Sequence, residues 1–179
     1  MVTMQRKPQM HLKHFSILTI LIFTLSSCAG YRLGNNKPSK FKKINSISVP
    51  IVESDIIQPK LQTLLTNSII RSIQEQGSYK IKKEKYSDAT LNARIKKINR
   101  KQLRASRENV LETTEMEFSI ELEYKVTKNL TGETIERGTI IGKSSSYLNT
   151  NFQLTESHSL RTAAEKAATS IANKLSEGF

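Results

Sequence analysis

Residues that most catalytic and metal sites require are scarce in this sequence. Cys28 is the single cysteine, so no disulfide bond can form within one chain. Of the three histidines, only His158 lies beyond the N-terminal segment. Catalytic triads need a positioned histidine, and zinc sites usually need several histidine or cysteine ligands. Glycine-rich phosphate-binding loops are also absent from the sequence. These absences predict a protein that is not an enzyme and that needs no metal or cofactor.

The sequence also lacks an apolar run long enough to span a membrane. The apolar stretch over residues 15–25 covers about half of the roughly 20 residues that a spanning helix needs. The basic residues Arg6, Lys7 and Lys13 precede it and small residues follow it, which is the organisation of a secretory signal. We therefore predict that residues 1–27 are a signal peptide and not a transmembrane anchor.

Cys28 closes the run Leu-Ser-Ser-Cys at residues 25–28. This run resembles the lipobox of bacterial lipoproteins, in which the cysteine is lipidated and becomes the mature N-terminus. The resemblance implies that Cys28 carries several acyl chains, which is what stable anchoring requires. Residue 29 is alanine and not the aspartate that retains Gram-negative lipoproteins in the inner membrane. The implied location is the periplasmic side of the outer membrane. An ordinary signal peptide with a chance cysteine is the alternative.

The chain after the signal peptide divides into a polar segment and one folded domain. Residues 28–43 are polar and rich in turn formers, and we expect them to be a lipidated N-terminus and tether. Residues 44–179 are long enough for a single domain with its own core. Alternation over residues 44–51 predicts a strand. A proline-initiated amphipathic pattern predicts a helix over residues 59–77, and a short strand is expected at residues 79–81.

The second half of the sequence shows the strongest alternation of apolar and polar residues. A strand is expected from Leu91 onward, with a slip in the pattern at Lys97-Ile98. Residues 115–126 alternate six times, which predicts a strand with one buried face and one wet face. A hairpin turn and a further strand over residues 134–147 follow.

The last helix is expected to present a single apolar stripe, made largely of alanine. Alanine permits close approach to a sheet or to another helix. Its members are Leu160, Ala163, Ala164, Ala167, Ala168, Ile171 and Leu175. With two helices and several strands that each have one apolar face, we predict an α+β fold. The expected architecture is a two-layer sandwich, in which two amphipathic helices pack on one face of a mainly antiparallel sheet of about four strands.

Charge is distributed very unevenly along the chain, which has a net charge of +12. The segment from Lys80 to Arg107 is strongly basic, and residues 108–123 contain glutamates but no lysine or arginine. One interpretation is that the two segments pair on adjacent strands, each opposite-charge pair stabilising the sheet by roughly 0.2–1 kcal/mol. The glutamates would then lie on a solvated strand face and not in the closed pocket of a carboxylate-pair enzyme.

The other interpretation is an anion-binding site near the turn that follows the basic strand. Only Glu108 and Glu112 are expected near the cations there. Arginine binds phosphate with two parallel hydrogen bonds, so the cluster suits the phosphates of a glycolipid or the acidic lumen of a partner. Nucleic acid is not expected as a partner because the chain is exported. The candidate contact residues are Arg94, Lys96, Arg100, Lys101, Arg104 and Arg107.

Several features together resemble the LptE-like lipopolysaccharide-assembly lipoproteins. Residues 28–34 read Cys-Ala-Gly-Tyr-Arg-Leu-Gly, similar to the Cys-Gly-Tyr or Cys-Gly-Phe start of that family. The chain departs from the pattern by inserting Ala29 and by lacking an arginine before Gly34. The order of expected elements also matches, as does the segment over residues 142–147 that precedes an alanine-rich last helix.

The resemblance implies a function without covalent chemistry. Members of the family plug the outer-membrane lipopolysaccharide-translocon barrel (LptD-like), assist its assembly, and bind lipopolysaccharide for delivery to the outer leaflet. An alternative from another class is a periplasmic regulator lipoprotein that docks on a peptidoglycan synthase and activates it. Such proteins usually have a longer tether than residues 29–43 provide, so the sequence favours work close to the membrane.

Overall fold

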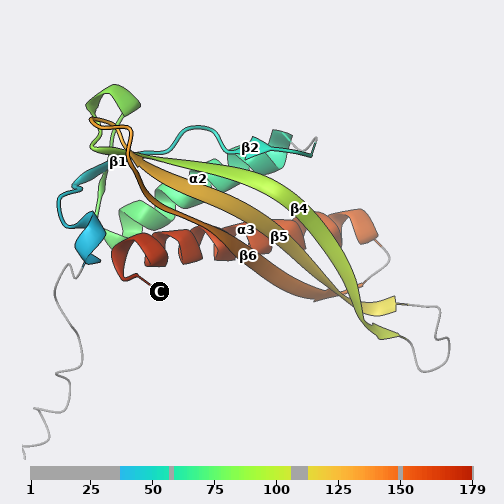
Figure 1. Ribbon diagram of the computed structural model, residues 1–179. Helices are drawn as coiled ribbons and strands as arrows, with labels where there is room; N and C mark the ends of the chain where they lie inside the picture. Colours follow the sequence, from blue (N-terminus) through green and yellow to red (C-terminus); the bar gives the residue numbers. More distant parts are fainter. Residues whose placement is uncertain (1–36, 57–58, 106–112, 149–150, 179) are drawn as a thin grey trace, which may run out of the picture. The chain divides into compact units, whose positions relative to one another are not determined.

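The protein is a two-layer α+β sandwich (Figure 1). The computed structural model describes residues 37–56, 59–105, 113–148 and 151–178. Two helices lie on one face of a sheet with six strands. The elements in chain order are η2 (Ser39–Phe41), β1 (Ser46–Ser48), β2 (Glu53–Ser54), α2 (Pro59–Gln76), β3 (Lys80–Ile81), η3 (Glu84–Tyr86), β4 (Ala89–Ala105), β5 (Thr113–Lys128), β6 (Thr134–Tyr147) and α3 (Phe152–Ser176).

The α+β class is confirmed, and the sheet has more strands than the four that the sequence predicts. The strand order is β3-β1-β4-β5-β6, and β2 pairs with β4. The three long strands β4, β5 and β6 form an antiparallel meander, whereas β1 and β2 run parallel to β4. Parallel neighbours need a crossover connection, and α2 provides it between β1 and β3.

The predicted slip in the basic strand is present as a β-bulge. The pairing of β4 with β5 shifts its register between Ile95 and Lys97. Two residues of a bulged strand face one residue of its neighbour, which accounts for the interrupted alternation in the sequence. Beyond the bulge, Ile98 lies opposite Ile120 and the apolar face continues.

Helix α2 packs on the sheet through the apolar face that its sequence predicts. Leu61, Leu65, Ile69 and Ile73 are all buried. Burying each such side chain contributes roughly 1.5–3 kcal/mol relative to leaving it exposed. The helix ends at Gln76, and Gly77 follows with a φ of 68°, a conformation that glycine adopts without steric cost.

Helix α3 lies unusually close to strand β6, as the alanine stripe predicts. Ala163 and Ala167 are fully buried. A Cβ atom added to Gly142 of β6 would lie 2.0 Å from the carbonyl oxygen of Ala163 and 2.7 Å from Cβ of Ala167. The helix begins after Asn151, whose side chain accepts a hydrogen bond of 3.1 Å from the amide of Leu154.

The core lies between the helices and the inner face of the sheet. Leu91 and Ile95 from β4 and Leu122 from β5 are fully buried there. Phe41 is also fully buried and packs edge-on against the Tyr79 ring, with a centroid separation of 6.4 Å. The core therefore includes a residue from the segment that the sequence assigns to the tether.

Candidate functional site

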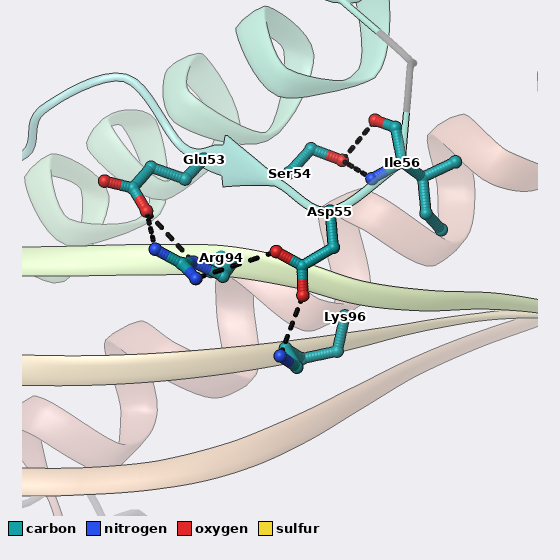
Figure 2. A network of polar contacts seen from close by, with 6 residues as sticks. All are labelled: Glu53, Ser54, Asp55, Ile56, Arg94 and Lys96. Atoms are coloured by element: carbon teal, nitrogen blue, oxygen red, sulfur yellow. Dashed lines mark hydrogen bonds and ion pairs between the residues drawn. The ribbon is translucent and has the colours of Figure 1, made fainter.

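The outer face of the sheet carries an ordered network of charged side chains (Figure 2). Arg94 of β4 lies opposite Glu53 of β2 and donates a hydrogen bond of 2.9 Å from Nε to Oε2. Its guanidinium also contacts Asp55, with 3.6 Å between Nη1 and Oδ1. Lys96 reaches the other oxygen of Asp55, with Nζ 2.8 Å from Oδ2. Two of the predicted contact residues therefore already bind carboxylates of their own chain.

The network fixes the charge state of its members. The hydrogen bond from Lys96 holds the pKa of the Asp55 carboxyl below its usual range. The hydrogen bond to Glu53 raises the pKa of Arg94, and the bond to Asp55 raises the pKa of Lys96. Each group is solvent-exposed, and exposed ion pairs contribute little to stability. The network therefore connects the short strand β2 to β4 and contributes little to the stability of the fold.

Beyond the bulge, the basic residues of β4 also meet carboxylates of other elements. Arg100 binds Glu156 of α3, and Arg104 binds Glu115 of β5 with 3.1 Å between Nε and Oε2. The expectation that only Glu108 and Glu112 would lie near these cations is wrong. Strand pairing brings one carboxylate and the packing of α3 brings the other, and neither is close in sequence.

Lys101 differs from its neighbours on β4. It is exposed and lies opposite Glu117 of β5, whose carboxylate is 3.6 Å from Lys143 of β6. Arg107 lies outside the described residues, as do Glu108 and Glu112. The structure thus brings five of the six predicted contact residues onto β4, four of them ion-paired.

Exposed apolar side chains gather at the same end of the molecule as Arg100 and Arg104, and the sequence analysis did not identify them. Phe152 packs against Phe118 of β5, with a ring separation of 6.4 Å. Tyr147 pairs with Glu115, the partner of Arg104. We define the distal end as Arg100, Lys101, Leu103, Arg104, Tyr147, Phe152 and Leu154. Its apolar members are 39–67% exposed. Phe152 and Leu154 precede the alanine stripe in the sequence. Two large apolar residues outside the predicted apolar face of the helix were the only sequence feature that could have indicated this exposed apolar group.

An open hollow of about 720 Å³ lies on the charged outer face of the sheet. Pro50 and Ile51 border it on one side, and it is floored by β4, β5 and β6. Arg94, Glu123 and Arg137 bring charges of both signs to its lining. In the described part of the chain, no three histidine, cysteine, aspartate or glutamate side chains are grouped to hold a metal ion. The lining of the hollow therefore carries charges of both signs.

Solved structures share the fold. A putative lipoprotein from Caulobacter crescentus matches with a TM-score of 0.50 and 14% identity, over 73% of this chain and 87% of that chain. A dodecameric PelC from Paraburkholderia phytofirmans matches with a TM-score of 0.51 and 9% identity, over 74% and 86%. A putative neuraminyllactose-binding hemagglutinin homologue from Helicobacter pylori matches with a TM-score of 0.50 and 11% identity, over 80% of this chain and 90% of that chain. At these identities the likeness shows the fold alone.

The family is shown by the sequence itself. The model of the LptE family, described as lipopolysaccharide-assembly, matches residues 44–175, which is more than half of the chain. The chain belongs to this family of lipoproteins and acts in lipopolysaccharide assembly at the cell envelope. The resemblance drawn from the N-terminal residues and the order of elements is confirmed. A comparison with curated proteins finds no match. Within the described ranges, no helix is both long and apolar enough to cross a membrane.

Proposed function

We propose that the protein is anchored by an acylated Cys28 at the periplasmic side of the outer membrane. There it assists assembly of the lipopolysaccharide-translocon β-barrel (LptD-like) and binds lipopolysaccharide for delivery to the outer leaflet. The family match over residues 44–175 is the observation that carries this proposal. The lipobox-like run before Cys28 and the alanine at position 29 support the anchor and its location.

The distal end has the chemistry that lipopolysaccharide requires. Lipid A presents phosphates next to acyl chains, so a site for it needs cations beside exposed apolar groups. Arg104 keeps 69% of its side chain exposed, and Tyr147 and Leu154 are 67% and 65% exposed. Arginine suits phosphate because its planar group donates two hydrogen bonds in parallel. These features support the distal end as the glycolipid contact.

The carboxylates that bind the distal arginines set a condition on this contact. To bind Arg104, a phosphate must displace Glu115 or share the arginine with it. The same holds for Glu156 at Arg100. Both pairs are partly exposed, with 18% of Glu156 and 15% of Glu115 accessible, so exchanging either carboxylate for a phosphate has a moderate cost. Lys101 has no such competitor within ion-pair distance among the described residues.

Charge reversal at the distal end tests the glycolipid contact. The variant replaces Arg100, Lys101, Arg104 and Arg107 with glutamate in the full lipidated protein, and displacement of a fluorescent lipopolysaccharide measures affinity. We expect affinity to fall at least about tenfold, because each charge-assisted contact is worth roughly 1.5–3 kcal/mol.

A matched control variant reverses four exposed cations on the helices: Lys60, Arg71, Arg161 and Lys166. It changes the net charge by the same amount and should leave the affinity within about twofold, since most surface charges act weakly at a distance. An equal loss in both variants, or no loss in the distal variant, would contradict the assigned contact. Circular dichroism confirms that each variant is folded.

The anchor has its own test. We expect the N-terminal peptide of the mature protein to begin at Cys28 and to carry the mass of a diacylglycerol and a further acyl chain. A Cys28→Ser variant should lose this modification, the incorporation of labelled palmitate, and its retention in the membrane. An unmodified Cys28 in the membrane-bound protein would refute the lipoprotein assignment.

A further inference from the structure

Three segments meet at the end of the sheet where the described chain begins (Figure 1). They are the segment before β1, the segment of β3 and η3, and the turn between β5 and β6. The amide of Lys80 donates a hydrogen bond of 2.9 Å to the carbonyl of Asn45, which joins the first two. The side-chain amide of Asn129 donates a bond of 2.8 Å to the carbonyl of Ser87, which joins the turn to them. The three segments therefore form one continuous surface.

This surface carries a concentration of unpaired positive charge. Its lysines are all exposed, and none has a carboxylate within ion-pair distance in the described part of the chain. We call them the proximal lysine surface: Lys42, Lys43, Lys80, Lys82, Lys83 and Lys85. The arginines and Lys96 on β4 are ion-paired by contrast.

Few acidic groups oppose the proximal lysine surface. Glu84 is exposed beside Lys83 and Lys85. Asp88 is committed to the backbone, because its Oδ2 accepts hydrogen bonds of 2.9 Å from the amides of Asn45 and Ser46. The charges of Glu84 and Asp88 oppose only part of the charge of the six lysines, so the surface keeps an excess of positive charge.

Two large apolar side chains protrude among these lysines. Leu130 is 96% exposed at the tip of the β5–β6 turn, and Tyr86 is 66% exposed at the end of η3. The ammonium of Lys85 lies 5.8 Å from the centre of the Tyr86 ring. A tyrosine and an aliphatic residue surrounded by lysines are typical of surfaces that rest in the headgroup region of a bilayer.

We propose that the proximal lysine surface docks on an anionic phospholipid bilayer. Lysine is a compact point charge that suits a diffuse layer of headgroups, whereas the bidentate arginines lie at the distal end. Cys28 precedes Lys37 by nine residues, a length that spans at most about 30 Å when extended. If Cys28 is acylated, as the proposed function holds, the anchor keeps this surface within reach of the membrane. The docking then directs the distal end away from that membrane.

Vesicle co-sedimentation of residues 29–179, which carry no leader and no lipid, isolates the contribution of the surface. This chain retains the whole core, which runs from Phe41 to Leu175, and circular dichroism checks its fold. The vesicles contain phosphatidylcholine alone, phosphatidylcholine with phosphatidylglycerol, or phosphatidylcholine with lipopolysaccharide at equal charge. We expect binding to the phosphatidylglycerol vesicles that weakens steeply as salt is added.

Two variants with the same loss of charge locate the contact. Replacing Lys80, Lys82, Lys83 and Lys85 with glutamine should lower the membrane partition coefficient on the order of a hundredfold. Replacing the control cations Lys60, Arg71, Arg161 and Lys166 with glutamine should change it by less than about twofold. Leu130→Ser should lower it by about fivefold, since it removes one inserted apolar side chain.

Three results would overturn the proposal. The first is that the protein does not bind phosphatidylglycerol vesicles. The second is that the two charge variants lose membrane binding equally. The third is that the protein binds the lipopolysaccharide vesicles more tightly than the phosphatidylglycerol vesicles. The first would point to an acidic protein as the occupant, and the third to the glycolipid. The phosphatidylglycerol vesicles contain neither barrel nor lipopolysaccharide, so failure there leaves the proposed function standing. Failure of the distal-end test likewise leaves the membrane docking standing.

Discussion

The Nε atom of Arg100 donates a hydrogen bond of 2.6 Å to Oε1 of Glu156. The two residues join strand β4 to the first turns of α3. Only 18% of the Glu156 side chain is exposed, against 48% for Arg100. The contact therefore holds the arginine in a fixed position at the distal end and partly neutralises its charge.

Releasing Arg100 from this carboxylate should strengthen glycolipid binding. We expect Glu156→Gln to raise lipopolysaccharide affinity about threefold, because it removes a partly exposed carboxylate that competes for Arg100 with an energy on the order of 1 kcal/mol. The matched control is Glu165→Gln, an exposed position of the same helix that loses the same charge. Fluorescent lipopolysaccharide displacement measures both. An equal rise in the two variants would mean that net charge, and not Arg100, determines affinity.

The close contact between α3 and β6 leaves no room for a side chain at Gly142, so a larger residue there should lower the stability of the fold. In Gly142→Ala the new methyl group would overlap the backbone of Ala163, so we expect the free energy of unfolding to fall by about 3 kcal/mol. Chemical denaturation followed by circular dichroism measures it, since the sequence has no tryptophan.

Gly138→Ala is the control for this substitution. The three heavy atoms nearest to its Cβ would all belong to the Tyr124 side chain, at 3.1–3.3 Å, and the end of a side chain yields more easily than a backbone. We expect a loss of about 1 kcal/mol there. A loss at Gly142 no larger than at Gly138 would contradict the packing of α3 on the sheet.

The Asp88 carboxylate should make stability depend on pH. Hydrogen bonds from the amides of Asn45 and Ser46 lower the pKa of Asp88 in the folded protein. A lowered pKa stabilises the fold above the unfolded pKa of about 3.9, and this stability is lost as the pH falls through the folded pKa.

Asp88→Asn isolates this contribution, because asparagine resembles the protonated acid. We expect the variant to lose about 1 kcal/mol at neutral pH, a modest value because the carboxylate is exposed. The difference from the natural protein should shrink between pH 7 and about pH 2, as the carboxylate becomes protonated. Denaturant unfolding at both pH values measures it, and a difference that persists in acid would refute the charge-based explanation.

Elements with long periodic patterns could be predicted from the sequence, and so could the short strands β1 and β3, but β2 could not. The alternation over residues 115–126 and the helical pattern over residues 59–77 each depend only on local spacing. Strand β2 was not predicted, because Glu53–Ser54 is too short to show a period and forms by pairing with β4. Helix α3 starts at Phe152, well before its alanine stripe, because Asn151 caps it there.

The basic residues of the candidate site could be named from the sequence, but their partners could not. Arg94 and its partner Glu53 are 41 residues apart, and Arg100 and Glu156 are 56 apart. Such pairs exist only after the sheet and α3 have assembled. For the same reason, the sequence could not separate the paired cations of β4 from the unpaired Lys80 and Lys82 that precede them.

We propose that the protein works with a lipopolysaccharide-translocon barrel. Affinity purification of the full lipidated protein from outer membranes, followed by mass spectrometry of what remains after detergent washing, tests it most directly. We expect one large β-barrel of the translocon type in stoichiometric amount. Recovery of a peptidoglycan synthase in its place, or of no partner, would contradict this proposal.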